Sequence, residues 1–318
     1  MKKLTAPPTL AQIEETHEAI KPFIHKTPVL TCQQLDNISG AHLFFKCENF
    51  QKIGAFKMRG ATSAALRLTD EEKRAGLATH SSGNHAQAVA LSAKLMNIPA
   101  HIVMPDVSPG IKVNATRGYG AQIYFCDNNQ QAREDALDKV LQETGAAFIH
   151  PYDDYNVIAG QATASKELLE AVPELDIVLA PIGGGGLMSG TALLTKYLSG
   201  NTKVYGAEPQ NVDDAWRSFT SGKLQKNTTV NTVADGLRTN LSERTFGIIQ
   251  KYVDDIFTVS EDAILEAMML IYERMKIVIE PSSAVPFAVV LAHPEIFKNK
   301  RTGIILSGGN VDLKQIFS

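Results

Sequence analysis

Two patterns of apolar residues alternate along the chain. Short segments at residues 77–80 and 100–104 predict strands, and the segments after them place apolar residues three or four positions apart, as helices do. The run at residues 177–182 (IVLAPI) is apolar throughout, which is typical of a parallel strand buried on both faces. Strands that alternate with helices predict an α/β protein whose parallel sheets carry helices on both faces.

Capping residues locate the ends of several further elements. Thr9 with Gln12 matches a capping box, so a helix is predicted to begin after Thr9. Ser260 is the predicted N-cap of a helix that ends near Lys276.

Ser108 and Pro109 match an N-cap and a first helical position, so a helix is predicted from there to Gly118. The other predicted strands are residues 43–46, 121–126, 146–149, 203–207, 255–259 and 303–306. The other predicted helices are residues 86–96, 131–141, 157–171 and 281–292, with one more from the glycines at 183–186 to residue 197.

The alternation also predicts where the chain divides into domains. Residues 76–151 read as a β-α-β-α-β unit that can form a small domain, and residues 1–75 with residues 152–318 form a larger one. A chain of 318 residues with 44% hydrophobic and 20% charged residues is large enough for two such cores.

Composition and charge exclude several classes of partner. The net charge is -3 and no five like charges are consecutive, so neither nucleic acid nor an anionic membrane is an expected partner. Cys32, Cys47 and Cys126 form no CxxC pair, which argues against a disulfide framework or a thiolate zinc site and fits a reducing cytosol. The chain has no apolar signal segment and no run of about 18 apolar residues. A cytoplasmic protein is therefore predicted.

The first candidate for chemistry is Lys57. Most lysines are solvated surface charges, and that alternative applies here too. Lys57, however, follows Ala55 and Phe56 and precedes Gly60, so small and aromatic residues surround it in the sequence. A lysine amine that such neighbours desolvate has a lowered pKa and becomes a nucleophile able to form a Schiff base.

Four consecutive glycines, residues 183–186, separate a buried strand from a helix. Glycines allow successive backbone N–H groups to converge on one anion, and the helix N-terminus adds a favourable field, so this loop is a candidate phosphate site. The alternative is a plain turn, which needs fewer glycines, and each glycine costs chain entropy. The loop matches neither GxGxxG nor GxxxxGK[ST], so a dinucleotide or Walker site is not indicated.

Three other polar stretches follow predicted strands. Residues 81–85 (SSGNH) offer hydroxyls, amides and a helix N-terminus that suit a carboxylate, although Ser82 could be only an N-cap and His85 could pack inside the helix. Ser307 follows the strand at 303–306, at the edge where α/β proteins bind ligands. The acidic loop that contains Glu208, Asp213 and Asp214 offers oxygen ligands for a divalent cation, or is simply solvated.

Together these stretches resemble, in order, the fold-type II pyridoxal-phosphate enzymes, and in particular the serine/threonine dehydratase and serine racemase branch. The resemblance extends from residue 27 to residue 312 and rests on the lysine segment, SSGNH, the four glycines and Ser307-Gly308-Gly309-Asn310. It implies two open twisted parallel-sheet domains of the tryptophan synthase β-like kind, with a small mobile domain that carries the substrate loop. It also implies pyridoxal 5'-phosphate as cofactor and a homodimer.

The resemblance implies roles for the matching residues. Lys57 would form the Schiff base and remove the α-proton, and Ser82 would carry a proton on the opposite face. Ser307 would be the neutral partner of the ring nitrogen, which it should not keep protonated. The implied cofactor residues are Phe56, Lys57, Asn84, Gly183, Gly184, Gly185, Gly186, Leu187, Gly236 and Ser307, the implied substrate residues are Ser81, Ser82, Gly83, Asn84 and His85, and the implied ligands of Mg²⁺ (or Mn²⁺ or Ca²⁺) are Glu208, Val212 and Asp214.

The implied reaction converts L-serine or L-threonine to a 2-oxo acid and ammonia, with serine racemisation as a further reaction. The alternatives are a threo-3-hydroxyaspartate ammonia-lyase that yields oxaloacetate, an enzyme that is primarily a serine racemase, and a non-catalytic carrier or sensor of the cofactor. Arg238, and as a weaker candidate Arg133, could bind a second carboxylate. Cys32, Gln33 and Ile53 replace residues of the nucleotide site in animal serine racemases, so activation by ATP is not expected.

Overall fold

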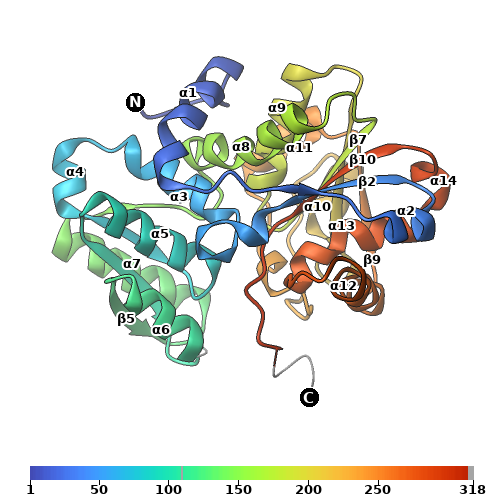
Figure 1. Ribbon diagram of the computed structural model, residues 1–318. Helices are drawn as coiled ribbons and strands as arrows, with labels where there is room; N and C mark the ends of the chain where they lie inside the picture. The colour runs from blue at the N-terminus through green and yellow to red at the C-terminus, as the bar shows by residue number, and fades with distance from the viewer. Residues whose placement is uncertain (109, 314–318) are drawn as a thin grey trace. The chain divides into compact units, whose positions relative to one another are not determined.

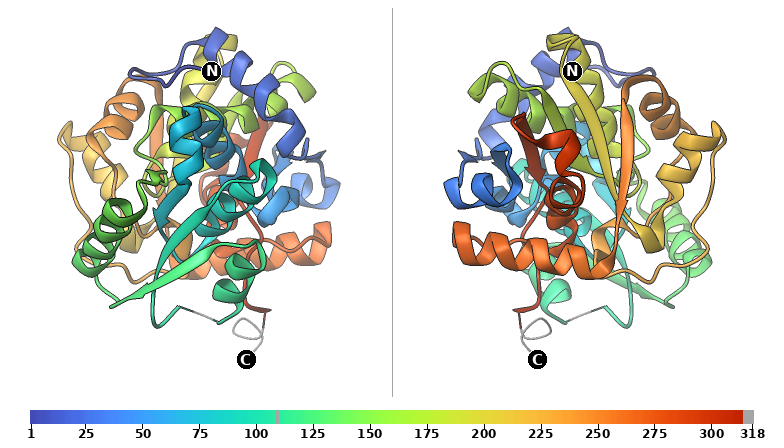
Figure 2. Two further views of the ribbon diagram at one scale, coloured as in Figure 1. Left: turned by 90° about the vertical axis from the view of Figure 1, so that its left-hand side faces the viewer. Right: turned by 90° about the vertical axis from the view of Figure 1, so that its right-hand side faces the viewer.

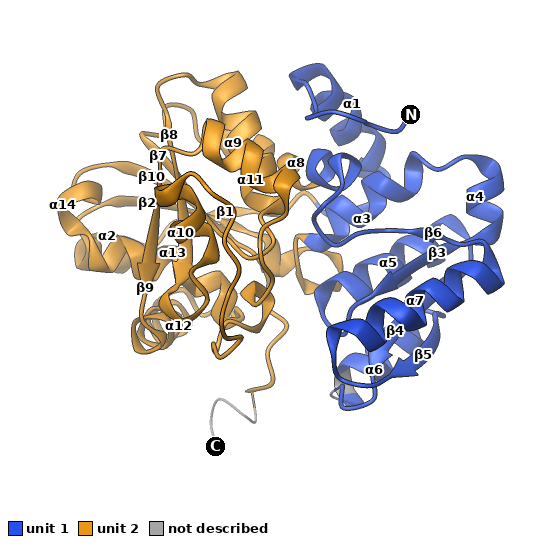
Figure 3. Ribbon diagram, turned by 180° about the vertical axis from the view of Figure 1, so that it is seen from behind, with its two compact units in different colours: residues 1–25, 57–160 blue, residues 26–56, 161–318 orange. Residues whose placement is uncertain are grey.

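The computed structural model describes residues 1–108 and 110–313, which form two compact units (Figure 3). Unit 1 contains residues 1–25 and 57–160, and unit 2 contains residues 26–56 and the chain from residue 161 onward. The predicted small domain, residues 76–151, lies inside unit 1, which also includes the N-terminal segment and residues 57–75. The mobility of that domain stays a prediction, and Pro109, the predicted first helical residue within it, lies outside the described residues. The chain passes from unit 2 to unit 1 between Phe56 and Lys57.

Unit 1 is built on a parallel sheet of four strands in the order β5-β4-β3-β6. Leu137 and Val140 of α7 pack against Ala78 and Val103 of this sheet. Helix α5 also packs against β3 and β4, α3 packs on α5, and α1 packs on α3 (Figure 1). The strands are β3 (Leu77–His80), β4 (Ala100–Pro105), β5 (Gln122–Cys126) and β6 (Ala147–Phe148), and the helices are α1 (Leu10–Ile20), α3 (Lys57–Leu66), α4 (Asp70–Ala75), α5 (Asn84–Met96), α6 (Gly110–Gly118) and α7 (Gln130–Thr144).

Unit 2 is built on a sheet of six strands in the order β1-β2-β10-β7-β8-β9. All neighbouring strands are parallel except β1, which pairs antiparallel with β2 at the edge. The strands are β1 (Val29–Leu30), β2 (His42–Cys47), β7 (Ile177–Pro181), β8 (Lys203–Pro209), β9 (Asp255–Val259) and β10 (Arg301–Leu306), and the helices are α2 (Gln33–Ser39), α9 (Gly186–Leu198), α10 (Asp214–Ser221), α11 (Glu243–Tyr252), α12 (Glu261–Met275), α13 (Pro281–Ala292) and α14 (Pro294–Phe297), while α8 (Tyr155–Ala171) continues from unit 1 into unit 2.

The sheet of unit 2 is buried on both faces by two separate cores. Ile177 and Leu179 belong to a core shared with α2, α12 and α13, whereas Val178 and Ala180 belong to a core shared with α8, α9 and α11. The ribbon views show these helices around the strands of unit 2 (Figure 1; Figure 2). Alternate residues of one strand therefore enter opposite cores, which explains why residues 177–182 are apolar without interruption. The predicted α/β class with parallel sheets is confirmed, and β1 is the antiparallel exception.

The structure also shows a predicted helix cap and the state of the three cysteines. A capping box at Thr9 and Gln12 begins α1, as predicted. Cys32, Cys47 and Cys126 are all free thiols. Within the described part of the chain, no helix combines the length and apolar character needed to cross a membrane.

A buried ion pair lies at the end of β2 in unit 2. The Nζ atom of Lys46 is 2.6 Å from Oε2 of Glu167, and the two side chains are 0% and 2% exposed. The same Nζ donates to the carbonyl oxygen of Thr27 at 2.7 Å. Two charges so deeply buried are tolerated because each one compensates the other.

Removing one partner of this pair should therefore be costly. We expect Lys46→Met to lower the free energy of unfolding by about 3–5 kcal/mol, because Glu167 is left as a buried charge without its cation. The matched control is Lys21→Met, which removes an exposed ion pair with Glu18 and should cost less than about 1 kcal/mol. Urea denaturation followed by circular dichroism measures both, and equal losses for the two variants would contradict the interpretation.

Candidate active site

Lys57 is the first residue of α3 and is half-buried. Its Nζ donates a hydrogen bond of 2.8 Å to the carbonyl oxygen of Pro151, in the segment that follows β6. Residues 58–65 of the helix are all buried, so packing fixes the backbone from which the lysine projects. The predicted catalytic amine is thus tied to a rigid helix and bonded to a backbone carbonyl.

His85 is held by the same segment of unit 1. Its side chain is buried, and its Nε2 lies 2.8 Å from the carbonyl oxygen of Ile149. Burial, followed by the nearby positive charge of Lys57, holds the pKa of His85 well below 6.5. The imidazole is therefore neutral, Nε2 carries the proton, and Nδ1 is an acceptor that finds no partner among the described residues.

The predicted substrate loop, residues 81–83, connects β3 with α5, and Asn84 is the first residue of that helix. Within the loop, the N–H of Gly83 donates to Oγ of Ser81 at 3.3 Å, and Ser82 is half-buried. Gly83 is the N-cap of α5 and has no side chain that could cap the helix. A helix start of this kind suits a carboxylate, as the sequence predicted.

The two candidate arginines differ in their surroundings. Arg133, on α7 of unit 1, is half-buried; its Nη2 donates to Asn128 at 2.7 Å, and its buried Nε has no partner in residues 1–108 and 110–313. Burial lowers the pKa of His80, which immediately precedes the substrate loop. The negative charge of Glu134 acts in the opposite direction, and the positive charge of Arg133 lowers the pKa further. Arg238, in unit 2, is exposed and donates to the carbonyl oxygen of Thr232 at 2.9 Å.

In unit 2, the four glycines at 183–186 join β7 to α9. Gly185 has φ +83°, a left-handed conformation that glycine adopts without strain. A Cβ atom at Gly185 would lie 2.6 Å from Leu241 Cδ2, and one at Gly183 would lie 2.9 Å from Leu237 Cα, so neither position has room for a side chain. No side chain in the described ranges caps α9. The loop therefore exposes backbone N–H groups at a helix start, the arrangement that binds phosphate.

Hydrogen bonds connect the other predicted cofactor residues of unit 2. The N–H of Phe56 donates to the carbonyl oxygen of Ser307 at 3.0 Å, and Oγ of Ser307 lies 3.1 Å from Oγ of Ser283 on α13. The neighbouring Ser282 accepts a hydrogen bond from the N–H of Gly236 at 3.1 Å. Gly236 lies beside the glycine loop, because a Cβ atom placed on Gly183 would be 3.2 Å from the Gly236 carbonyl oxygen.

Glu208 is fully buried near the carboxyl end of β8. Its two carboxylate oxygens accept hydrogen bonds from the N–H groups of Ala215 and Trp216, at 3.1 and 2.9 Å, in the first turn of α10. Burial, followed by the negative charge of Asp214, nevertheless raises the pKa of Glu208 well above 4.5. A buried carboxylate whose proton affinity is raised further by a second carboxylate is a favourable place for a cation.

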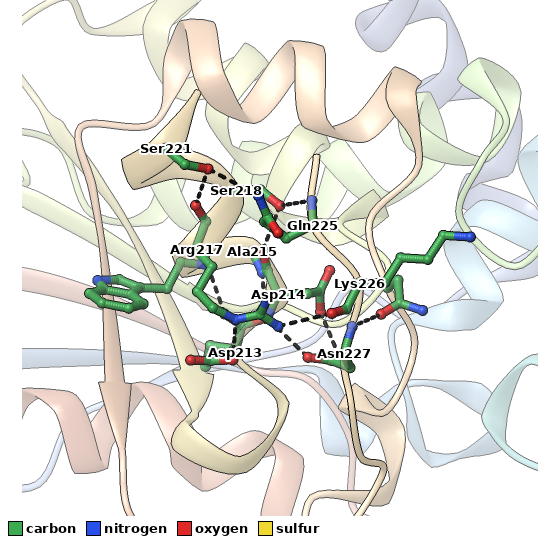
Figure 4. Close-up of polar contacts among 12 residues, drawn as sticks. Asp213, Asp214, Ala215, Arg217, Ser218, Ser221, Gln225, Lys226 and Asn227 are labelled. Atoms are coloured by element: carbon green, nitrogen blue, oxygen red, sulfur yellow. Dashed lines mark hydrogen bonds and ion pairs between the residues drawn. The ribbon is translucent and has the colours of Figure 1, made fainter. Parts of the chain in front are cut away.

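Asp214, also fully buried, accepts a hydrogen bond from Leu241 N–H at 2.8 Å. It accepts another from Asn227 Nδ2 at 2.7 Å (Figure 4). Burial raises its pKa from 3.8 to about 6. Among the described residues, no three His, Cys, Asp or Glu side chains are grouped to hold a metal, so a cation here would need the carbonyl of Val212 and water to complete its ligands. The donor set, all hard oxygen atoms, fits Mg²⁺ or Ca²⁺.

Sequence reasoning missed two polar residues beside Ser307. Ser283 contacts it directly, and Glu280, 4% exposed, has a carboxylate oxygen 2.8 Å from the position of a Cβ on Gly308. Both lie at the start of α13, which is otherwise apolar from residue 284 to residue 292. Buried polar residues at the start of an apolar helix were the signal that could have identified them.

Comparisons with known proteins identify the family. The family model described as pyridoxal-phosphate dependent enzyme matches residues 20–308. A beta-hydroxyaspartate dehydratase of Paracoccus denitrificans is 48% identical over 309 residues, which cover 97% of this chain and 98% of that protein. The crystal structure of serine racemase from Dictyostelium discoideum is similar, with 47% identity and a TM-score of 0.92. The crystal structure of the T.th. threonine deaminase has 44% identity and a TM-score of 0.92. Each of the two matches covers 96% of this chain and 99% of the chain in the solved structure.

Because the pKa of His85 is lowered in the folded protein, we expect the free energy of unfolding to depend on pH. Below pH 6.5 the unfolded chain takes up a proton on this imidazole that the folded protein does not bind, so stability should fall as the pH falls. The contribution of this one group reaches at most about 1.4 kcal/mol per pH unit. We expect His85→Gln, which cannot titrate, to flatten the pH dependence of the free energy of unfolding below pH 6.5.

Urea denaturation at a series of pH values measures this effect. The matched control is His42→Gln at an exposed position of β2, which should retain the steeper wild-type dependence. If His85→Gln loses stability with acid as steeply as the wild type does, the buried neutral imidazole is not the source of the slope.

Proposed function

The chain belongs to the family of pyridoxal-phosphate dependent enzymes, and from this premise we propose that it is a lyase acting on small β-hydroxy amino acids. L-serine and L-threonine would be converted to a 2-oxo acid and ammonia, with serine racemisation as a further reaction. The observation that carries the proposal is Lys57, the half-buried amine that begins α3. The names of the similar proteins, a dehydratase, a deaminase and a racemase, support the same class.

Each residue of unit 1 has a task in this proposal. When bound, pyridoxal phosphate supplies the electron sink that makes the α-proton of an amino acid removable. The Nζ of Lys57 takes that proton as a general base, and the start of α5 with residues 81–83 orients the substrate carboxylate. The β-hydroxyl leaves with a proton as water, and hydrolysis of the enamine product releases ammonia. Ser82 carries the proton on the opposite face when the outcome is racemisation.

The residues of unit 2 fit the cofactor that the family implies. The glycine loop at 183–186 leaves no room for a Cβ and starts α9, so it suits the phosphate group. Two serines of α13 hydrogen-bond to Gly236 and Ser307, and the carbonyl oxygen of Ser307 accepts from the N–H of Phe56. These residues suit the pyridine ring of the cofactor. A carrier or sensor of the cofactor would also need these residues, but it would have no use for a base and an opposite-face proton donor.

A second candidate substrate is threo-3-hydroxyaspartate, which would yield oxaloacetate. One observation favours it: Arg133, on α7 of the unit that also contains the substrate loop, keeps a buried Nε without a partner among the described residues. A guanidinium with an unused donor can bind a second carboxylate by charge-assisted hydrogen bonds. Arg238, the stronger candidate from the sequence, is exposed, and its Nη2 already donates to a carbonyl oxygen. The geometry thus supports Arg133 over Arg238.

We further propose that Glu208, Asp214 and the Val212 carbonyl bind a divalent cation that stabilises unit 2. The support is the burial of two carboxylates with raised pKa values and hard oxygen donors. A homodimer, a cytoplasmic location and the lack of ATP activation stay predictions from the sequence.

One set of incubations tests the proposed reaction. Holoenzyme with Mg²⁺ is given L-serine, D-serine, L-threonine or L-threo-3-hydroxyaspartate, and the 2-oxo acid and the chirality of remaining serine are measured together. We expect release of a 2-oxo acid that is lost in Lys57→Ala. Arg133→Ala should lower kcat/KM for hydroxyaspartate by about 10- to 100-fold, since a charged hydrogen bond is worth about 1.5–3 kcal/mol, and should spare serine. Arg238→Ala is the matched control.

The outcomes separate the alternatives. No ammonia from any of these amino acids would leave only the carrier. D-serine that accumulates from L-serine, and is lost in Ser82→Ala, would make the protein primarily a racemase. Equal losses for serine and hydroxyaspartate in Arg133→Ala would remove this arginine as the selector of a second carboxylate, and a selective loss in Arg238→Ala would restore the original candidate.

The cation site predicts a shift in thermal stability. A ligand that binds only the folded state at about 100 times its Kd adds about 2.7 kcal/mol. We therefore expect Mg²⁺, Mn²⁺ or Ca²⁺ to raise the Tm of protein treated with chelator, and Glu208→Gln or Asp214→Asn to abolish the rise. Asp213→Asn, which alters the neighbouring half-exposed carboxylate, should keep it. An unchanged Tm of the wild-type protein with every cation would refute the site.

A further inference from the structure

Ile53 has a backbone conformation that is unfavourable for its side chain. It lies in unit 2, in the short turn Lys52–Gly54, with a φ of 62° and a ψ of 7°. A β-branched residue in this left-handed region is an outlier, because its Cβ approaches the following carbonyl oxygen. In the described ranges, the other non-glycine residues with positive φ are asparagine, glutamate and lysine, and none of these is β-branched. Strain of this kind persists only where neighbouring contacts impose it.

The side chain of Asn310, in the segment after β10, holds this turn. Its Nδ2 donates to the carbonyl oxygen of Ile53 at 2.6 Å. Its Oδ1 would lie 2.8 Å from a Cβ atom on Gly54, which has a φ of +71°, so the amide group lies against this glycine. The donor must be Nδ2, because a reversed amide would place two acceptor oxygens 2.6 Å apart with no proton between them. One asparagine side chain thus contacts both residues of the turn that have positive φ.

This contact extends a short antiparallel pairing that ends directly before Lys57. The pairing joins residues 53–56 to residues 307–310, and all of them belong to unit 2. Its backbone contacts are Gly309 N–H to the Gly54 carbonyl oxygen at 2.9 Å, Phe56 N–H to the Ser307 carbonyl oxygen at 3.0 Å, and the bridge between Ala55 and Gly308. The side chain of Asn310 continues the pairing by one residue, as far as Ile53.

We infer that Asn310 is a positioning residue that keeps Ile53 left-handed and thereby sets the path of the chain through Phe56 to Lys57. The inference rests on the proposed function, in which Phe56 suits the cofactor ring and Lys57 removes the α-proton. Helix α3 fixes Lys57 on one side of this junction, and the pairing fixes the chain on the other. Without the Asn310 hydrogen bond, Ile53 would relax to a negative φ, and the residues between it and Lys57 would shift.

The alternative is that Asn310 only anchors the chain after β10. In that case its loss would lower stability, but the conformation of Ile53 would not matter for the reaction. If Asn310 acts through Ile53, a residue that adopts positive φ without help should make the asparagine dispensable. Glycine is such a residue, whereas alanine is not. A comparison of these two residues at position 53 therefore separates the two roles.

The first measurement tests the conformation of Ile53 apart from activity. Ile53→Gly and Ile53→Ala lose nearly the same packing and differ mainly in their tolerance of positive φ. At most positions the alanine variant is the more stable, because glycine loses more conformational entropy on folding. Here we expect the reverse order, with the higher Tm in Ile53→Gly, measured on the holoenzyme by circular dichroism. A higher Tm in Ile53→Ala would overturn the inference, whatever reaction the protein catalyses.

The second measurement uses Asn310→Asp, which keeps the size of the side chain but loses the Nδ2 donor. We expect kcat to fall by about 10- to 100-fold, because the amine that accepts the proton is displaced, while KM changes little. The substrate is the amino acid that the wild-type holoenzyme converts fastest. The visible circular dichroism of the bound cofactor should change as well, since it reports how the protein holds the ring.

Asn49→Asp is the matched control for this measurement. It removes a hydrogen bond of 3.1 Å from Asn49 Nδ2 to the carbonyl oxygen of Val278 in the same unit. Because Val278 has no positive φ, this variant should keep the kcat and the visible spectrum of the wild type.

Double variants show whether Asn310 acts through Ile53. We expect Ile53→Gly to restore most of the kcat and the spectrum that Asn310→Asp loses, and Ile53→Ala to restore neither. If Asn310→Asp does not fold by itself, the same double variants are compared for folding, and only the one with Ile53→Gly should fold. Equal results for glycine and alanine, or a wild-type kcat in Asn310→Asp, would reduce Asn310 to an anchor and overturn the inference. If the proposed function fails instead, the wild type releases no 2-oxo acid, while the order of the two Tm values stays as expected.

Discussion

Burial of parallel sheets on both faces is the constraint on which the rest of this structure depends. A sheet with a core on each side has no face left for polar chemistry, so functional side chains are confined to the ends of its strands. In unit 2, the glycine loop follows β7, Glu208 lies near the end of β8, and Ser307 follows β10. In unit 1, the segment with Ser81 follows β3. In unit 2, the same packing that makes β7 apolar throughout thus leaves the polar residues at the ends of the strands.

The second constraint is that polar groups near these strand ends are themselves buried, and backbone groups satisfy most of them. His85 bonds to a carbonyl oxygen, Lys57 bonds to another, and both oxygens of Glu208 accept N–H groups from α10. Backbone partners cannot move away when a charge changes, which keeps the geometry fixed but leaves some charges poorly compensated. The raised pKa values of Glu208 and Asp214 are the sign of that imbalance.

The sequence predicted the elements whose pattern is strong and local. The strands at 77–80 and 255–259 and the helix at 281–292 have the predicted bounds, because each is a distinct apolar segment between turn or capping residues. Helix α3 was not predicted. Its sequence, KMRGATSAAL, has small and polar residues that are buried on nearly all sides, so it lacks the apolar stripe of a surface helix. The short edge strand β1 was missed because two residues give no periodicity.

The candidate site was predictable to the extent that its residues form contiguous motifs. The glycine loop, SSGNH and the lysine segment are each read from adjacent letters, and a resemblance could connect them. Ser283 belongs to no such motif, and its only signal in the sequence is a polar position at the start of an otherwise apolar helix. Its hydroxyl bonds to both backbone groups of Gly308, 25 positions later. Motifs identify which side chain meets a ligand, whereas the partners that hold that side chain in place are brought together only by the fold.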